Sequence, residues 1–152
     1  MADGIVKNVE ASAPIFGLPV EIVHASTDRE LVAALSGLSQ RAGAVLLVTV
    51  DGFFFNRRAL IVTLAARHAL PTVYYSREYA EVGGLITYGS DITDAYRQAG
   101  LYTGRILKGA RPEEMPIVQV NKLELIINAQ SARALGLTVP QSLQIAADEV
   151  IE

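Results

Sequence analysis

PTVYYSREYAEVGGLITYGSDITDAYRQAGLYTGRILKG, residues 71–109, is the stretch that decides the fold. Residues 72–75 form a β-branched and aromatic run that predicts a strand, and the glycine pair 83–84 leads into a second such run at 85–88. Gly89-Ser90-Asp91 then supplies helix-capping side chains, and apolar or aromatic residues recur at helical spacing to the end of the stretch. The stretch therefore predicts two strands and a long helix. Open α/β sheets bind small ligands where a strand end faces a helix N-terminus, so we expect the function here.

The residues before this stretch predict strands that alternate with helices. The unbroken apolar run AVLLVTV suits a parallel strand that is covered on both faces. Ser26-Thr27-Asp28, with Glu30 behind it, matches a helix cap. Because strands alternating with helices imply a right-handed parallel sheet, the expected fold class is α/β. The expected helices are 5–16, 31–40 and 56–70, and the expected strands are 19–25 and 44–50.

The pattern changes after the central stretch. Residues 111–116 form a polar linker bounded by prolines, and the turn-rich segment 109–116 is the best candidate for a segment boundary. The residues beyond it predict a strand at 117–128 broken near Asn121-Lys122, a short helix at 131–135 stopped by Gly136, and a terminal helix at 141–150. That terminal helix carries Asp148 and Glu149, which we expect to be solvated.

Composition limits the classes of function. A chain of 152 residues, about half of them apolar, can bury a core and is expected to form a single unit. The formal charge of −3 and the scattered Lys and Arg residues argue against a nucleic-acid surface. Without cysteine there is neither a disulfide framework nor thiolate chemistry.

The first residues carry no export signal. Residues 1–4 do not begin a signal peptide, which would show a basic region followed by an apolar one. No apolar stretch approaches the length of a membrane span. As written, the chain is expected to be neither exported nor membrane-spanning.

The order of several landmarks resembles a known family. LVTVDGFF, ALPTVYYSREYAEVGGLITYGSDITDAYRQAG, GRILKGARPEEMPI, KLELIINAQSARALGLTVPQSL and ADEVIE follow one another over nearly the whole chain. In this order they resemble the C-terminal half of the ABC-transporter substrate-binding proteins of the tryptophan/tyrosine-binding type. No single piece is a strong motif, and the resemblance depends on their occurring together.

The resemblance implies a periplasmic-binding-protein fold of type I, in which two three-layer α/β lobes are joined by crossover strands and hold a small ligand between them. It also implies an extracytoplasmic protein that presents a solute, such as an aromatic amino acid, to an ABC permease. On this analogy residues 1–83 belong to the second lobe, 84–112 cross into the first, and 117–152 return. A complete member is longer, with a signal peptide, most of one lobe and the first strand of the other in its N-terminal part.

The crossover unit has a consequence for assembly. Its helix would present an apolar face that needs a partner. We therefore expect a homodimer in which two chains bury these faces against each other or exchange segments.

Residues that follow the strands are the first candidates for ligand binding. Asp51-Gly52 follows AVLLVTV, where it either faces the cleft or forms an ordinary strand-to-helix turn. In Phe53-Phe54-Phe55 one ring, taken as Phe53, is expected to stack on a ligand, whereas at least two rings are expected to serve core packing or dimer contact. Tyr75-Ser76 offers hydroxyl groups, and Arg77-Glu78 is interpreted as a solvated helix start rather than a pair of ligand contacts.

Tyr88-Gly89-Ser90-Asp91 is the strongest candidate. Backbone amides at a helix N-terminus attract a carboxylate, and glycine permits close approach. Asp91 could instead bind an ammonium group, and a routine N-cap explains Ser90 and Asp91 equally well.

Catalytic interpretations have less support. His24 and His68 lack metal-site spacing, so no metal or cofactor is expected, and Ser76 lacks a G-x-S-x-G setting. The sequence therefore predicts a solute-binding protein rather than an enzyme. A dimeric sensor or interaction module is the alternative, and a small hydrolase or isomerase would have to find its acid–base pair among Asp51, Glu78 and Asp91.

Overall fold

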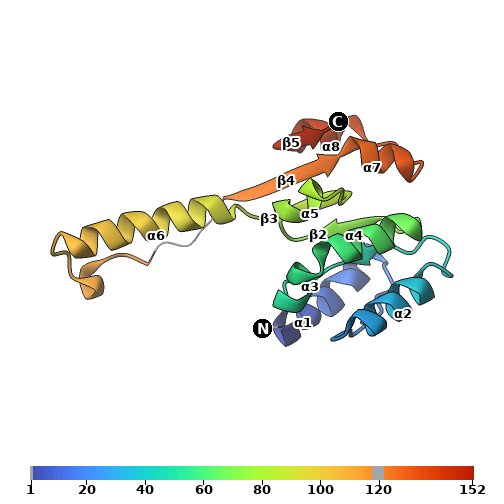
Figure 1. Ribbon diagram of the computed structural model, residues 1–152, viewed down its shortest axis with the longest axis horizontal. Helices are drawn as coiled ribbons and strands as arrows, with labels where there is room; N and C mark the ends of the chain where they lie inside the picture. The colour runs from blue at the N-terminus through green and yellow to red at the C-terminus, as the bar shows by residue number, and fades with distance from the viewer. Residues whose placement is uncertain (1, 118–121) are drawn as a thin grey trace.

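The computed structural model describes residues 2–117 and 122–152, and in these the chain forms a sheet-and-helix body from which one long helix projects (Figure 1). Five strands pair in sequence order, and all neighbours are parallel except β3 and β4. The strands are β1 (Leu46–Leu47), β2 (Thr72–Tyr74), β3 (Ile86–Ser90), β4 (Leu123–Asn128) and β5 (Glu149–Ile151). The predicted α/β class with a mostly parallel sheet is confirmed.

The helices follow the sequence patterns closely. The helix predicted at 5–16 is α1 with a 3₁₀ turn behind it, stopped by Gly17 at φ +67°. Thr27 and Glu30 form a reciprocal capping box at the start of the second helix. The helical elements are α1 (Ala2–Ser12), a 3₁₀ turn (Ala13–Phe16), α2 (Asp28–Leu38), α3 (Gly52–Asn56), α4 (Arg58–Arg67), α5 (Arg77–Glu81), α6 (Ile92–Leu107), a 3₁₀ turn (Pro112–Glu114), α7 (Ala129–Ala134) and α8 (Gln141–Ala146).

The core lies between one face of the sheet and the helices α2, α4 and α5. Val48 of the loop after β1 and Tyr74 of β2 pack against Leu31 of α2, Ile61 of α4 and Tyr79 of α5. The rings of Tyr74 and Tyr79 stack with their centroids 4.6 Å apart. A second buried cluster of Leu35, Leu64, Ala65 and Leu70 lies beside the first, and burial of both stabilises the N-terminal half.

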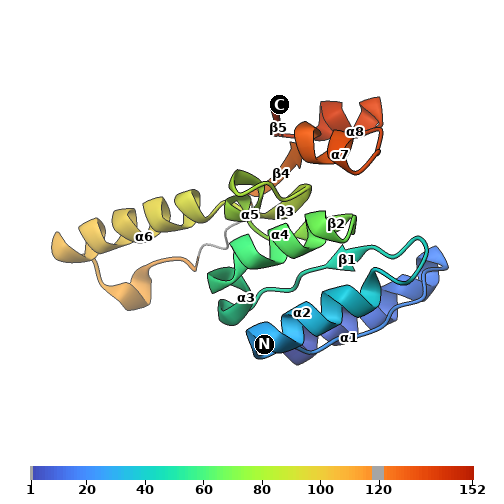
Figure 2. The same ribbon diagram turned by 45° about the vertical axis from the view of Figure 1, so that its right-hand side comes forward.

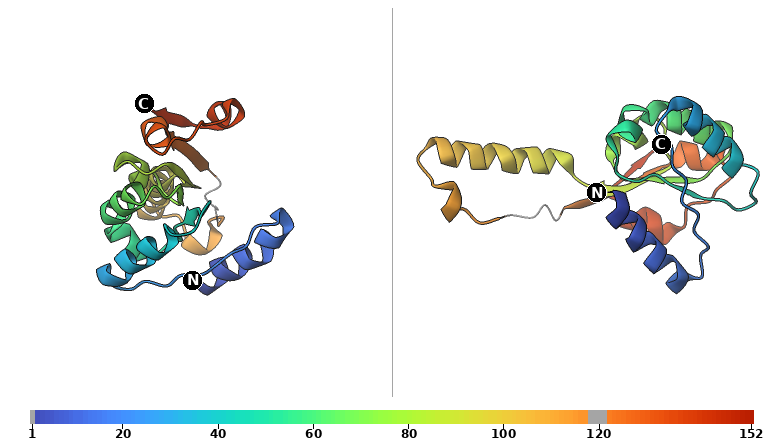
Figure 3. Two further views of the ribbon diagram at one scale, coloured as in Figure 1. Left: turned by 90° about the vertical axis from the view of Figure 1, so that its right-hand side faces the viewer. Right: turned by 90° about the horizontal axis from the view of Figure 1, so that it is seen from below.

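The opposite face of β1 is open, which corrects two sequence predictions. Val45 and Leu47 expose 64% and 51% of their surface, so the run at 44–50 is a two-residue strand covered on one face. Residues 19–25 are not a strand, and within the described chain no backbone hydrogen bond joins them to the sheet. Their β-branched residues have strand propensity, but a strand also needs a partner with which to pair. Helix α1 stands apart from the sheet (Figure 3).

The C-terminal segment corrects a third prediction. The helix expected over 141–150 ends at Ala146, and Glu149 begins β5, which pairs with β4. The turn is held by Asp148, whose N–H donates to the carbonyl of Leu125 at 2.9 Å while its carboxylate accepts the Leu125 N–H at 2.8 Å. The strand expected over 117–128 forms only at Leu123–Asn128, since residues 117 and 122 are not in a strand. The break expected near Asn121-Lys122 falls partly in 118–121, outside the described residues.

Beyond their pairing with β2 and β5, the outer ends of β3 and β4 (88–90 with 123–125) form a short two-stranded antiparallel ribbon that carries α6 away from the body (Figure 2). The returning loop lies along this helix, and the hydroxyl of Tyr102 donates to the carbonyl of Pro116 at 2.7 Å. Between helix and loop is a groove of about 430 Å³ lined mainly by apolar residues, including Ala99, Ile106 and Met115. In the described part of the chain, no helix has the length and apolar character to cross a membrane.

Candidate functional site

The loops that follow β1 and β2 meet at the carboxyl edge of the parallel strands. The hydroxyl of Tyr75 donates to the main-chain carbonyl of Asp51 at 3.3 Å. Residues that follow adjacent parallel strands come together at this edge, and open α/β sheets bind their ligands there. The structure therefore brings together two of the segments that the sequence singled out.

Asp51 caps the short helix α3. Its Oδ1 accepts hydrogen bonds from the N–H groups of Phe53 at 2.7 Å and Phe54 at 3.4 Å, so the strand-to-helix turn expected for this residue is present. Its Oδ2 makes no hydrogen bond to the described residues, and the side chain lies in an exposed position. One oxygen of this carboxylate thus has no hydrogen-bond partner among the described residues.

The three phenylalanines of α3 lie against the core. All three are half-buried and pack on the cluster formed by α2, α4 and β2, so the core packing expected for at least two of them is confirmed. Phe55 meets the ring of Tyr79 edge-on at 6.4 Å. Phe53 lies under the guanidinium group of Arg57 at 5.5 Å, and Phe55 lies under that of Arg58 at 5.0 Å.

Polar atoms near this edge are buried without partners. The Nε of Arg58, the Oγ of Ser76 and the Oε2 of Glu78 make no hydrogen bond within the described chain. Burial raises the pKa of the Tyr75 hydroxyl, which donates to the Asp51 carbonyl. Buried polar atoms without partners are uncommon, and at a strand edge they are candidates for ligand contact.

Tyr88, Gly89, Ser90 and Asp91 lie at the end of β3, where the ribbon leaves the body. Tyr88 exposes 55% of its surface. Gly89 passes so close to β2 that a Cβ added there would lie 1.8 Å from the carbonyl oxygen of Tyr75. This contact brings the third predicted segment to the same edge as Asp51 and Tyr75.

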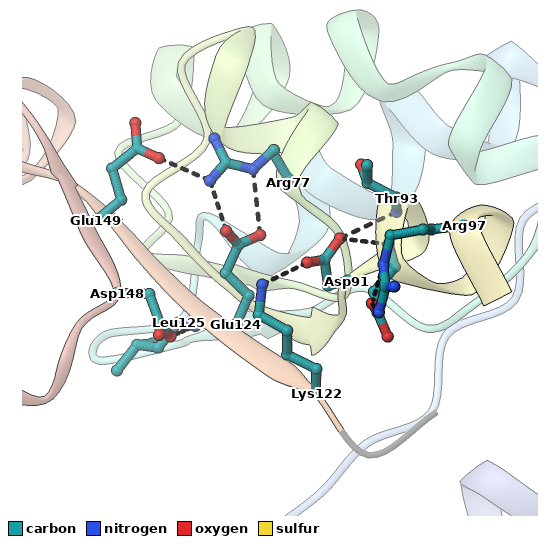
Figure 4. Close-up of polar contacts among 10 residues, drawn as sticks. Arg77, Asp91, Thr93, Arg97, Lys122, Glu124, Leu125, Asp148 and Glu149 are labelled. Carbon is teal, nitrogen blue, oxygen red and sulfur yellow. Dashed lines mark hydrogen bonds and ion pairs between the residues drawn. The ribbon is translucent and has the colours of Figure 1, made fainter. Parts of the chain in front are cut away.

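The N-cap expected at Asp91 is confirmed. Its Oδ1 accepts from the N–H groups of Thr93 and Asp94 at 3.0 and 3.1 Å, and its Oδ2 accepts from Nζ of Lys122 at 2.7 Å (Figure 4). The hydrogen bond from Lys122 is the main cause of the lowered pKa of Asp91. The amides at the start of α6 are therefore already bound to a carboxylate of the chain itself.

Arg77 makes contacts that the sequence did not predict. It begins α5 as expected and its side chain is 37% exposed, but its guanidinium group is also ion-paired. It binds both carboxylate oxygens of Glu124 in β4 and one oxygen of Glu149 in β5 (Figure 4). Glu149 was expected in a helix and lies in β5 instead, although its side chain is exposed as expected. No spacing rule could find this cluster, because its members come from segments far apart in the sequence.

Other sequence candidates stay outside the site. The Nε2 of His68 lies 3.3 Å from the hydroxyl of Ser36, in agreement with a structural role. No hydrogen bond of the described chain joins Asp51, Glu78 and Asp91 to one another as an acid–base pair. Across residues 2–117 and 122–152 no group of three metal-ligating side chains gathers.

Solved structures of about twice the length share this fold. A conserved domain protein from Vibrio cholerae aligns with a TM-score of 0.83 at 20% identity, over 98% of this chain and 50% of that one. The ABC domain in complex with L-Trp from Streptococcus pneumoniae aligns at 0.84 and 25%, over 99% and 52%. A ligand-free, open substrate-binding protein with adhesive properties from Clostridium difficile aligns at 0.70 and 21%, over 99% and 50%.

These alignments mean that the chain spans about half the length of the solved structures it matches. Among curated proteins there is no significant match. The family model described as ABC transporter substrate binding protein, in contrast, matches residues 2–151. With that match over nearly its whole length, the chain belongs to the ABC transporter substrate-binding protein family.

Proposed function

We propose that the chain binds a small organic solute, such as an amino acid, at the carboxyl edge of β1 and β2. The observation that carries the proposal is the hydrogen bond from the Tyr75 hydroxyl to the Asp51 main-chain carbonyl, which joins the loop of Tyr75 to the loop that bears the Asp51 carboxylate and the Phe53 ring. The unpartnered atoms of Ser76 and Glu78 add polar contacts there. The residues proposed to line the site are Asp51, Phe53, Tyr75, Ser76, Tyr88, Gly89, Ser90 and Asp91.

The proposed site lies between two lobes. Residues 1–83 and 117–152 build one lobe, and residues 84–112 cross over the β3–β4 ribbon to contribute to the other. The whole protein then works outside the cytoplasm as the binding component of an ABC transporter and delivers its solute to a permease, without catalysing a reaction. Support comes from the family match and from the structural relative that is in complex with L-Trp. An aromatic amino acid would use the rings of Phe53 and Tyr88.

Asp51→Asn tests the charge of the site without removing the helix cap, since asparagine caps a helix as well as aspartate does. If Oδ2 of Asp51 receives the ammonium group of the solute, the substitution weakens binding by about 1.5–3 kcal/mol, roughly 10-fold to 150-fold in Kd. Titration calorimetry with L-tryptophan and then with the other amino acids measures the effect. Circular dichroism checks that the helix content is unchanged.

Glu113→Gln is the matched control, because it removes one carboxylate from the exposed linker, far from β1. It should leave Kd unchanged. Equal affinity of Asp51→Asn and the parent chain for an amine-bearing solute would remove Asp51 from the site. Failure of every amino acid to bind the parent chain would contradict the proposed solute class.

A dimeric sensing or interaction module is the second candidate, and the exposed apolar surface of α6 favours it. Leu107 and Tyr96 expose 82% and 74% of their surface, and the groove beside them is lined mainly by apolar residues. Such a patch on a soluble protein commonly marks a contact site.

If two chains bury this groove against each other, native mass spectrometry at micromolar concentration shows a dimer, and Ala99→Arg in the groove converts it to a monomer. Thr63→Arg on the exposed face of α4 is the control and leaves the dimer intact. A parent chain that is monomeric at every concentration would contradict the module.

A further inference from the structure

Arg77 fastens the body of the molecule to the ribbon that carries α6. Its Nε lies 3.1 Å from Oε2 of Glu124, and its Nη2 lies 2.5 Å from Oε1 of the same residue. The same Nη2 lies 2.7 Å from Oε2 of Glu149. We define these three residues as the clasp. Through it, the first residue of α5 is bound to both of the strands that follow the excursion to α6 (Figure 4).

The clasp sits within the ribbon, one residue pair from the end that leads to α6. Glu124 is the cross-strand partner of Gly89, and Gly89 is the residue that passes against the carbonyl oxygen of Tyr75. Arg77 is two residues beyond Tyr75. Strand β3 is therefore held by the close contact of Gly89 with the Tyr75 backbone, and strand β4 is held by the guanidinium group of Arg77.

The geometry of the clasp restrains orientation as well as distance. A guanidinium group that binds both oxygens of one carboxylate is planar and directional, unlike an ammonium group. The Glu124 side chain is only 18% exposed, so solvent screens this pair less than a surface pair. The two carboxylates raise the pKa of Arg77, with Glu124 as the larger cause. Without the cation, two like charges on neighbouring strands would face each other and repel.

We propose that Arg77 is a positioning residue that sets the angle at which the β3–β4 ribbon and α6 leave the sheet. In the proposed two-lobed protein, this angle determines the width of the cleft between the lobe that contains the sheet and the lobe to which α6 contributes. The clasp controls the angle in the chain without ligand. Its effect on solute affinity is a second step that rests on the proposed function. Because Arg77 directly follows Ser76, the clasp also fixes the loop that bears the Ser76 hydroxyl.

The angle can be measured directly, because the chain has no cysteine of its own. Ala66→Cys on the exposed face of α4 and Leu107→Cys at the far end of α6 provide two spin-label sites. Pulsed electron spin resonance on labelled chains diluted with unlabelled ones gives the intramolecular distance distribution. Since a bidentate pair restrains orientation, Arg77→Gln should broaden this distribution roughly two-fold and shift its mean.

Matched variants separate the clasp from a general loss of charge. Arg111→Gln removes an arginine that pairs with Glu113 and Glu114 on the exposed linker, and it should leave the distribution unchanged. Arg77→Lys keeps the charge without the bidentate geometry and should give an intermediate width. If Arg77→Gln fails to fold, Glu124→Gln keeps the side-chain shape and tests the same contact.

A distribution that is the same in the parent, Arg77→Gln and Glu124→Gln overturns the clasp, whether or not the chain binds a solute. A broadened distribution in these variants supports the clasp, even if no variant binds L-tryptophan. An absence of L-tryptophan binding would count against the proposed function alone. If L-tryptophan does bind, a change in its Kd for Arg77→Gln supports the second step. An unchanged Kd overturns that step and leaves the first in place.

Discussion

Replacing Gly89 with alanine is expected to cost about 3 kcal/mol or more in the free energy of unfolding, because the new Cβ cannot be accommodated without moving the backbone. The added carbon would lie 1.8 Å from the carbonyl oxygen of Tyr75 and 2.8 Å from its carbonyl carbon. Both neighbours are main-chain atoms, so no side-chain rotation can relieve the overlap. Strand β3 would have to separate from the end of β2, which loosens the base of the ribbon.

Gly104→Ala is the control for this prediction. Gly104 lies inside α6, and a Cβ added there meets nothing within 4 Å. Alanine in a helix interior is favoured over glycine by about 0.5–1 kcal/mol, so this variant should be slightly more stable than the parent. Urea unfolding followed by circular dichroism measures both variants. If Gly89→Ala is as stable as the parent, the close contact between Gly89 and the Tyr75 backbone is absent in solution.

The chain should lose stability between pH 10 and 12, because its core buries tyrosine hydroxyl groups that stay protonated in the folded state. Burial raises the pKa of Tyr74 to about 12, and it also raises the pKa of Tyr79. In the unfolded chain both phenols ionise near pH 10. The stabilisation is therefore complete below about pH 10 and is lost as the pH rises toward the folded pKa. For Tyr74 the difference corresponds to about 3 kcal/mol.

Tyr74→Phe removes the ionisable group and keeps the ring that stacks on Tyr79. Its unfolding free energy should fall less steeply than that of the parent when urea unfolding is compared at pH 8 and pH 11. Tyr96→Phe is the control, since Tyr96 is 74% exposed, and its pH dependence should match the parent. Identical slopes for Tyr74→Phe and the parent would mean that Tyr74 ionises without opening the core.

Local signals predicted the helical part of the fold well. The capping residues Thr27 and Asp91 begin α2 and α6 as expected, since each satisfies amide groups within its own turn. Strands were less predictable, because a strand depends on a partner that sequence does not reveal. Residues 19–25 have the composition of a strand but no partner, whereas β5 begins at Glu149, inside the helix expected over 141–150, and pairs with β4.

The candidate site could be predicted where it depends on topology. The rule that strand ends meet at one edge placed Asp51 beside Tyr75, and the structure joins them by a hydrogen bond. The rule could not show that Asp91 already satisfies the amides of α6. Nor could it show that Arg77 binds Glu124 and Glu149, because those contacts arise only when three separate segments pack together.

Because the ribbon joins α6 to the body, a small rotation of the ribbon displaces the far end of this helix. At a rise of 1.5 Å per residue, the 16 residues of α6 span about 24 Å. A rotation of about 10° at the base of the ribbon would move the far end by about 4 Å, more than the length of a hydrogen bond. Angular changes too small to disturb the packing around Gly89 would thus become displacements that a neighbouring protein surface can detect.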